Sequence, residues 1–366
     1  MKHFSFGLAA MASLAVSASA HTVFTTLFVD DVTQGDGTCV RMPSDPGKCT
    51  NPVNGVTSND MACGADGEKA VALTCPAPAG GKLTFQFREW ADAEQPGAID
   101  KSHKGPCAIY AKQVQDMADD KATGSGWFKL WHEGYDSNTK QWCTEKLIAN
   151  KGLLSFEIPD GLPAGYWLFR PELLALHEAD KGDPQFYVGC AQVFVKSSNT
   201  ATLKVPTDHM VNIPGHVHAA DPGLTFNIYR PSFPYPLPGP KVFTVPSPRK
   251  GAMIDVAGSD APKQTQGVLP AKYIVKNANW VGVEVPSYKN ENGCWSSSQN
   301  CWKQVNTCYQ TAPPTGDAGC IALEKKCNAI QAGCSDGEFV GPPNQGKLLV
   351  VKEPKPPGNI PAAVNV

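Results

Sequence analysis

The sequence predicts a mainly β protein, an immunoglobulin-like antiparallel β-sandwich with long loops that is followed by a small disulfide-stapled α-helical hairpin at the C-terminus. From residue 21 to about 206, apolar side chains recur with period two in short runs bounded by Gly, Pro, Asn and Asp. No stretch in this region has the length and period of an amphipathic helix. After residue 290, six cysteines form two groups in which neighbours stand seven residues apart, close to two helical turns.

Residues 1–20 have the form of a secretory signal peptide. A weakly basic start precedes an apolar run at 4–16, and Ala18–Ala20 has the small-x-small form that signal peptidase accepts. We therefore expect a secreted, extracellular protein whose mature chain begins at His21. Thirteen cysteines in an exported chain indicate disulfides rather than a cytosolic zinc site. No later run reaches the roughly 18 to 20 apolar residues of a transmembrane helix, so we expect no membrane partner.

Residues 21–245 are predicted to form the sandwich domain. Many short strands joined by loops favour two packed antiparallel sheets. The net charge of -2 comes with no basic or acidic block, which removes the electrostatic case for nucleic acid or anionic lipid as a partner. The expected strands are 22–29, 83–90, 107–114, 127–131, 153–158, 166–170 and 185–195.

The composition changes after residue 245. Residues 246–290 are rich in Pro, Gly, Lys and Asn, and we interpret them as an extended connector that can lie on the sandwich. Residues 291–337 hold the cysteine groups, and the proline-containing segment 338–366 is expected to be a flexible tail.

The two cysteine groups fit two antiparallel helices stapled three times around a turn at 313–319. Helix axes about 8 to 10 Å apart bring facing Cα atoms into disulfide range. Each cysteine of the first group is followed by an aromatic residue, Trp295, Trp302 or Tyr309, and this row fits either packing on the rest of the chain or a sugar-stacking face. The pairs that share the residue sum 628 are Cys294–Cys334, Cys301–Cys327 and Cys308–Cys320.

Cleavage after Ala20 leaves His21 with a free α-amino group. The pKa of such an amine is near 8, so the amine can give up its proton to a metal, and ring Nδ1 of the same residue can bind the same ion. A second imidazole would complete a T-shaped, nitrogen-only site of the kind that Cu(II) prefers. The simpler interpretation is that signal peptidase tolerates many residues after the cut and that His21 is accidental.

Four further residues could complete such a site. His103 lies in a loop that leads into a predicted strand, and His177 follows another strand. Gln185 and Tyr187 share one face of a third strand because side chains alternate. Considered singly, each has a simpler role as a turn histidine, a core tyrosine or a surface polar group. Together they offer a second imidazole, an axial phenol and two groups that could steer an oxygen species.

These residues carry a resemblance to a known family. Spaced motifs that fall in order over residues 21 to about 243 resemble the fungal cellulose-active lytic polysaccharide monooxygenases of auxiliary activity family nine. The motifs are HTVF at 21–24, HKGP at 103–106, GYWLFRPELLALH at 165–177, QFY at 185–187, DPGL at 221–224 and YPLPGP at 235–240.

The resemblance implies a site and an activity. It implies one copper ion, cycling between Cu(II) and Cu(I), held by the His21 amine and ring and by His103, with Tyr187 at the axial position. It implies that His177 and Gln185 assist oxygen activation. The expected reaction is oxidative cleavage of cellulose through hydroxylation at C1 or C4, with O2 or H2O2 and an external reductant.

The resemblance also implies the partners. We expect cellulose or a related plant cell-wall polysaccharide, a small-molecule or protein electron donor, and a monomer. Because a crystalline polysaccharide cannot enter a deep cleft, the site should lie on a flat face with exposed aromatic rings. The resemblance puts Tyr235 on that face, and the alternative is a loop aromatic packed among prolines.

Two other functions compete with this one. A glycoside hydrolase would need two carboxyl groups flanking the scissile bond, and Glu172 and Asp183 are the acidic residues nearest the motifs. A non-catalytic copper-binding or wall-binding protein would keep the copper ligands and lack turnover. The spacing of His216 and His218 can also bind metals, although a solvated loop is the simpler interpretation.

Seven cysteines precede residue 200, so at least one lacks a partner in the sandwich. The resemblance suggests Cys63 with Cys190. We assign Cys107 with Cys143 and Cys39 with Cys49, which leaves Cys75 as a free thiol.

Overall fold

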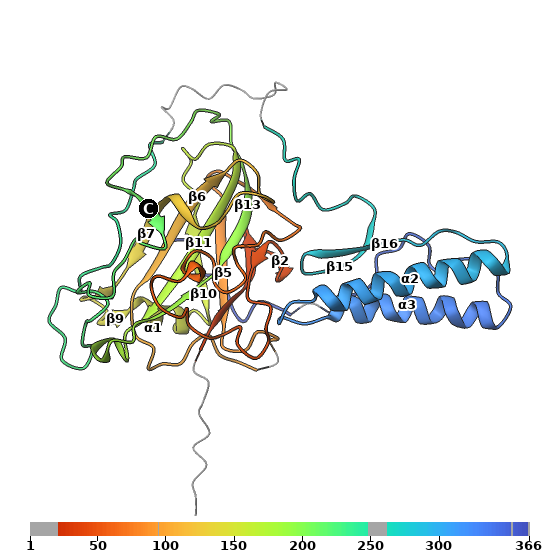
Figure 1. The fold of residues 1–366 in the computed structure, drawn as a ribbon, viewed down its shortest axis with the longest axis horizontal. Helices are drawn as coiled ribbons and strands as arrows, with labels where there is room; N and C mark the ends of the chain where they lie inside the picture. The colour runs from red at the N-terminus through yellow and green to blue at the C-terminus, as the bar shows by residue number, and fades with distance from the viewer. Residues whose placement is uncertain (1–20, 94, 248–261, 353, 365–366) are drawn as a thin grey trace, which may run out of the picture.

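The computed structural model describes residues 21–93, 95–247, 262–352 and 354–364. The predicted signal peptide at 1–20 lies outside this range. A β-sandwich forms the body of the molecule, and a module of one β-hairpin and two long helices projects from it as a rod (Figure 1). The predicted fold class is confirmed. No helix among the described residues combines the length and apolar character needed to cross a bilayer.

The smaller sheet of the sandwich has four strands, and each neighbouring pair is antiparallel. Every residue of β1 is buried, as are six of the seven in β5, because these two strands occupy the middle of the sheet. In spatial order the strands are β10 (Leu153–Glu157), β5 (Lys82–Arg88), β1 (Val23–Val29) and β2 (Val32–Asp36).

The larger sheet contains eight strands around β11 (Gly165–Ala175), which pairs with β6, β12 and β13. The buried faces of the two sheets enclose one apolar core, in which Phe24, Phe85 and Trp167 are almost wholly buried. The other strands are β3 (Val40–Arg41), β4 (Cys75–Pro78), β6 (Cys107–Val114), β7 (Gly124–Glu133), β12 (Gln185–Val188), β13 (Cys190–Lys196) and β14 (Met210–Ile213).

Short elements fill the loops of the sandwich. A two-stranded ribbon leads into a short helix, and two 3-10 turns lie in other loops. They are β8 (Tyr135–Asp136), β9 (Gln141–Trp142), α1 (Cys143–Ala149), η1 (Asn59–Met61) and η2 (Ala179–Lys181).

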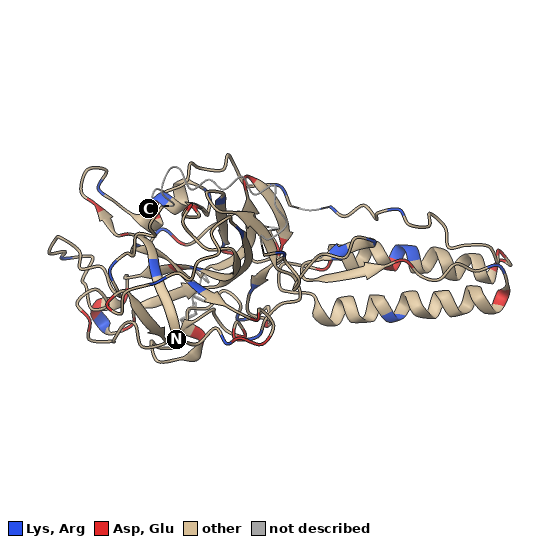
Figure 2. Ribbon diagram, turned by 90° about the horizontal axis from the view of Figure 1, so that it is seen from above, with Lys and Arg blue, Asp and Glu red and all other residues tan. Residues whose placement is uncertain are grey.

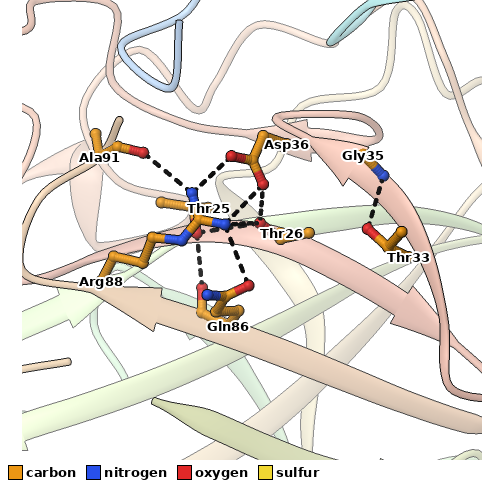
Figure 3. A network of polar contacts seen from close by, with 8 residues as sticks. All are labelled: Thr25, Thr26, Thr33, Gly35, Asp36, Gln86, Arg88 and Ala91. Atoms are coloured by element: carbon orange, nitrogen blue, oxygen red, sulfur yellow. Dashed lines mark hydrogen bonds and ion pairs between the residues drawn. The ribbon is translucent and has the colours of Figure 1, made fainter. Parts of the chain in front are cut away.

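A buried ion pair fixes the start of β1 (Figure 3). The Arg88 guanidinium binds both carboxylate oxygens of Asp36 at 2.6 and 2.8 Å and donates to the Thr26 hydroxyl. One residue before β1, the Thr22 hydroxyl donates to the carbonyl oxygens of Arg88 and Ala98. A charge-assisted, bidentate contact of this kind is geometrically specific, so the chain leaves β1 toward residue 21 in a defined direction.

The predicted helical hairpin is confirmed. Helix α2 (Glu291–Thr311) and helix α3 (Ala318–Ser335) are joined by three disulfides with the predicted pairing, and their Cα atoms lie 5.4 to 5.7 Å apart. The strands β15 (Tyr273–Asn277) and β16 (Trp280–Val283) pack against the helices and share their core. The region expected to be only a connector therefore contributes a β-hairpin to the module.

The connector residues before β15 contact the sandwich. The backbone amides of Thr265 and Gln266 both donate to the Tyr166 hydroxyl at 2.7 and 2.8 Å. At the junction with the module, the Asn279 side chain accepts from the Cys39 amide and donates to the Gly37 carbonyl. These contacts attach the module to the turn between β2 and β3.

The C-terminal segment, expected to be a flexible tail, returns along the module and the sandwich. The Leu349 amide donates to the Ile274 carbonyl of β15 at 2.7 Å, and the Val364 amide donates to the Ser155 carbonyl of β10 at 2.9 Å. The described residues 338–364 thus make backbone hydrogen bonds to both parts of the molecule.

One predicted disulfide is wrong. Cys39 pairs with Cys75 instead of Cys49, and Cys49 is buried with a free thiol. The reason is the sheet topology: β11 occupies one edge of β13, and β3 and β4 pair with successive parts of the other edge, which brings Cys75 to the residue that precedes β3. The other two pairs, Cys63–Cys190 and Cys107–Cys143, form as expected.

Candidate metal centre

Three predicted ligands meet at one end of the sandwich. The ring centroids of His21 and His103 are 6.5 Å apart, and the Tyr187 ring lies 6.2 Å from the first and 6.0 Å from the second. His21 precedes β1, Tyr187 belongs to β12, and His103 comes from the loop before β6. Segments that are far apart in sequence therefore bring two imidazole rings and a phenol together.

The His103 loop is fixed by a close approach of two backbones. A Cβ atom at Gly105 would lie 1.8 Å from the Leu174 carbonyl oxygen, so only glycine fits there. The Gly105 amide donates to the Thr144 hydroxyl of α1 at 2.9 Å, and the Leu176 amide donates to the Lys104 carbonyl. The loop is thus held between α1 and the end of β11, which sets the position of the His103 ring.

The surroundings of His103 suit a neutral metal ligand. Its Nδ1 lies 3.1 Å from the Ser102 hydroxyl, whereas its Nε2 is buried and has no hydrogen-bond partner among the described residues. Burial and the neighbouring His177 ring lower the pKa of His103 to about 4. The imidazole is therefore neutral at working pH, with one nitrogen held and the other left for a further interaction.

Tyr187 and Gln185 form a hydrogen-bonded pair on one face of β12. The Tyr187 hydroxyl donates to Gln185 Oε1 at 2.8 Å, and the amide nitrogen of Gln185 lies 3.3 Å from the Asp183 carboxylate. Burial, with a smaller contribution from Asp183, raises the pKa of Tyr187 well above its ordinary value. Tyr187 is consequently a neutral phenol, and its bond fixes the orientation of the Gln185 amide.

His177 stacks on His103. The two ring centroids are 4.0 Å apart with an interplanar angle of 31°, and His177 Nδ1 is buried without a hydrogen-bond partner among the described residues. Burial lowers the pKa of His177, so this ring is also more readily neutral than a solvated histidine. All five predicted site residues thus lie within one cluster.

The predicted stacking residue, Tyr235, is buried. Only 9% of it is exposed, its hydroxyl donates to the Gly223 carbonyl, and its ring meets Trp142 and Phe226 edge to face. The prediction that Tyr235 presents a ring to substrate is therefore wrong, because the tyrosine is enclosed by aromatic neighbours in the same loop region.

Tyr229 is the aromatic residue that the sequence analysis missed. It is 65% exposed, and its hydroxyl donates to the His177 carbonyl at 3.2 Å, which ties it to the cluster. Asn227 Oδ1 accepts from the Tyr229 amide, while its Nδ2 donates to Asp180 in η2. The signal in the sequence was the turn residue Asn227 two positions before Tyr229, which favours a loop.

The carboxyl pair required for a hydrolase does not form. Glu172 lies in β11, is 4% exposed and binds the buried Arg170 at 2.7 Å, whereas Asp183 is exposed beside the metal cluster. His216 also belongs to this buried group, with Nε2 3.6 Å from Glu172, while His218 is exposed. Glu172 therefore has a structural role. Because His216 is buried beside it and His218 is exposed, these two histidines lie in different environments.

The residues present fit copper. No set of three or more His, Cys, Asp and Glu side chains in the described ranges has the arrangement of a metal site. A site that uses two imidazoles and one amine would not include a third such side chain. The orphan Nε2 of His103, a second imidazole 6.5 Å away and a neutral phenol form a nitrogen-rich donor set, which favours copper over Mg²⁺ or Ca²⁺.

Comparison with known proteins matches this geometry. The model of Auxiliary Activity family 9 (formerly GH61) matches residues 21–235. AA9 family lytic polysaccharide monooxygenase H of Botryotinia fuckeliana is 53% identical over 336 residues, which cover 89% of this chain and 75% of that protein. AA9 family lytic polysaccharide monooxygenase C of Aspergillus tamarii is 49% identical over 348 residues, which cover 93% and 92% of the two chains.

Solved structures resemble the sandwich. One named CvAA9A superposes with a TM-score of 0.55 at 34% identity and covers 61% of this chain and 98% of its own. A cellulose-active polysaccharide monooxygenase from M. thermophila gives a TM-score of 0.50 at 27% identity, with 61% and 99% covered. The match to the family model ends at residue 235, and the helical module lies beyond it.

Proposed function

Because the chain belongs to Auxiliary Activity family 9, a family of secreted copper enzymes that cleave polysaccharides oxidatively, we propose that it acts on cellulose through a copper ion held by His21 and His103. The chain is a lytic polysaccharide monooxygenase, an oxidoreductase. The observation that carries the proposal is the convergence of His21, His103 and Tyr187 around the buried, unpartnered Nε2 of His103.

The proposed copper site assigns a donor atom to each ligand. After cleavage at residue 20, the His21 amine and ring nitrogen would hold the ion together, and His103 would hold it through Nε2. Tyr187 would lie beside it as a neutral phenol. Bound copper would supply one-electron chemistry and a place for O2 or H2O2 to react with a sugar C–H bond.

The remaining residues of the cluster can orient the oxygen co-substrate and supply a proton to it. The amide oxygen of Gln185 accepts from Tyr187, so the amide nitrogen faces away from the phenol; one of its N–H groups donates to Asp183, and the other can donate to an oxygen co-substrate. His177 can hold a proton at a ring nitrogen beside the same space. Hydroxylation at C1 or C4 of the sugar then makes the glycosidic bond break without a hydrolytic water.

Substrate would lie on the face that carries Tyr229. An exposed ring tied to the His177 backbone offers a platform for stacking on a pyranose, as expected for an enzyme that meets a flat polysaccharide surface. The cellulose activity of the M. thermophila polysaccharide monooxygenase supports this substrate class.

Product analysis tests the proposal. The mature chain beginning at His21 is loaded with copper and incubated with cellulose, with and without ascorbate. The soluble products are then identified by mass spectrometry. We expect oxidised oligosaccharides only with ascorbate, and none from a His103→Ala control. Unoxidised oligosaccharides alone would indicate a hydrolase, and copper binding without any product would indicate a non-catalytic protein.

A further inference from the structure

One face of helix α2 carries alternating aromatic and amide side chains. The residues recur at intervals of four and three, so at about 100° per residue they lie within an arc of about 80° beside the disulfide row. Gln299, Asn306 and Tyr309 are exposed, and the two tryptophans are half-buried. We call this row the aromatic–amide stripe, and it consists of Trp295, Gln299, Trp302, Asn306 and Tyr309.

The rings of the stripe are held in place from one side. Trp295 and Trp302 pack against the apolar core of the module and remain partly exposed. The Trp302 indole N–H donates to Gln331 Oε1 at 2.8 Å, and the Tyr309 hydroxyl donates to Glu324 Oε2 at 2.6 Å, both on α3. Three disulfides fix α3 relative to α2, so these rings lose little further freedom when a ligand binds.

The stripe itself is uncharged. Helix α2 carries only two charged residues, Glu291 at its start and Lys303 outside the stripe, and Figure 2 shows how few charges the helix pair bears. Burying a charged polymer here would leave its charges without partners, whereas a neutral polymer of hydroxyl groups finds amides and ring faces. The stripe is therefore complementary to a neutral glycan.

The spacing of the rings fits an extended sugar chain. Seven residues of α-helix advance the backbone by about 10 Å, close to the length of one disaccharide unit in an extended β-1,4-linked glucan. Successive rings at 295, 302 and 309 can therefore meet equivalent sugar faces along one chain. The exposed amides at 299 and 306 lie between the rings, where they can bond the sugar hydroxyls.

We propose that the aromatic–amide stripe is a second polysaccharide-binding surface, which holds an extended β-1,4-glucan chain along helix α2. The inference rests on the proposed action on cellulose, because it assigns the same polymer to a site outside the match to the family model. The rod then serves to keep the copper site near the surface that it oxidises.

Binding to cellulose without reductant tests the stripe apart from the chemistry. The copper-loaded, full mature chain is compared with Trp302→Ala, Tyr309→Ala and the double variant in depletion isotherms on microcrystalline cellulose. Thr307→Ala, about 140° around the helix from Trp302, is the matched control. We expect roughly 3- to 10-fold weaker binding for each ring removed, and no change for the control. Trp302→Phe keeps a ring and should retain most of the affinity.

Unchanged cellulose binding by the double variant, or an equal loss of binding in Thr307→Ala, would contradict the proposal that the stripe binds polysaccharide. Thermal unfolding and peptide mapping of the three disulfides identify any variant that is misfolded, and Tyr309→Ala, which removes an exposed ring, then carries the test. A wild-type dimer that dissociates in Trp302→Ala, seen by light scattering without a change in cellulose binding, would assign the stripe to self-association and contradict the proposal. Oxidised products from cellulose with ascorbate are measured separately, and their absence in the wild type would contradict the proposed function while leaving the binding result intact.

Discussion

The residues around His103 keep its imidazole neutral. Burial and the adjacent His177 ring lower the pKa of His103 to about 4, while the Ser102 hydroxyl engages its other nitrogen. A protonated imidazole has no lone pair to give to a metal. The same burial that protects the ligand would be costly for an unpartnered polar atom, so the orphan Nε2 indicates a ligand that occupies it.

Replacing Tyr229 with alanine should weaken the docking of substrate and leave the metal site intact. The ring is 65% exposed, so its loss creates no cavity, and we expect roughly 3- to 10-fold weaker cellulose binding. Copper affinity measured by calorimetry should not change. Tyr235→Phe, which removes only the buried hydrogen bond to Gly223, serves as the control and should bind cellulose normally. If the control loses affinity and Tyr229→Ala does not, the assignment of the stacking residue is reversed.

The exposure of these two tyrosines shows where sequence reasoning stops. The order of the motifs was enough to predict His21, His103, His177, Gln185 and Tyr187, because each stands in a short segment whose residues are distinctive. Which of Tyr229 and Tyr235 faces solvent depends on how one loop folds over Trp142. That choice is made by tertiary packing, and no local pattern encodes it.

Strand β11 links the metal cluster to a buried ion pair. Its residues Arg170 and Glu172 are almost wholly buried and lie 2.7 Å apart, and His216 lies against the same carboxylate. Burial alone would raise the pKa of Glu172, but the Arg170 charge and His216 outweigh it and lower that pKa to about 2. The pair therefore favours the ionised carboxylate in the folded protein.

The ion pair between Arg170 and Glu172 should make the free energy of unfolding depend on pH. The folded pKa of Glu172 lies below its ordinary value of 4.5, so its contribution is fully present above about pH 4.5 and is lost as the pH falls toward 2. Glu172→Gln should lower the free energy of unfolding by roughly 3 kcal/mol at neutral pH. Calorimetric Tm values should then fall less steeply below pH 4.5 in the variant than in the wild type. Parallel Tm profiles would show that Glu172 is not the titrating group.

Disulfides differ in how far sequence can predict them. In the helical module the two rows of cysteines follow from the helix period alone. Pairing the cysteines whose residue numbers have a constant sum was sufficient to predict the three disulfides. In the sandwich, Cys39 and Cys75 meet because β3 and β4 pair with successive parts of the same edge of β13, which is a property of the sheet order. Proximity in the chain favoured Cys49 and was misleading.

The molecule as a whole joins a catalytic β-sandwich to a projecting module whose two helices are linked by three disulfides. Connector residues bind the Tyr166 hydroxyl, the Asn279 side chain binds the turn at Gly37, and the C-terminal segment reaches β10. Hydrogen bonds at these three places thus hold the rod, which projects from the sandwich in Figure 1. The sequence predicted the two parts and their order, but the hairpin of β15 and β16 was hidden in a segment whose Pro and Gly content is typical of a linker.

The account depends most directly on the free amine of His21. Two forms of the chain are prepared, one beginning at His21 and one with a single glycine before it, and each is titrated with Cu(II) and assayed on cellulose with ascorbate. The first form should bind one copper ion, give an axial EPR spectrum and release oxidised oligosaccharides, because its amine and ring chelate together. The extended form should bind copper far more weakly and release none. Equal copper affinity and equal oxidised product from the two forms would contradict the account.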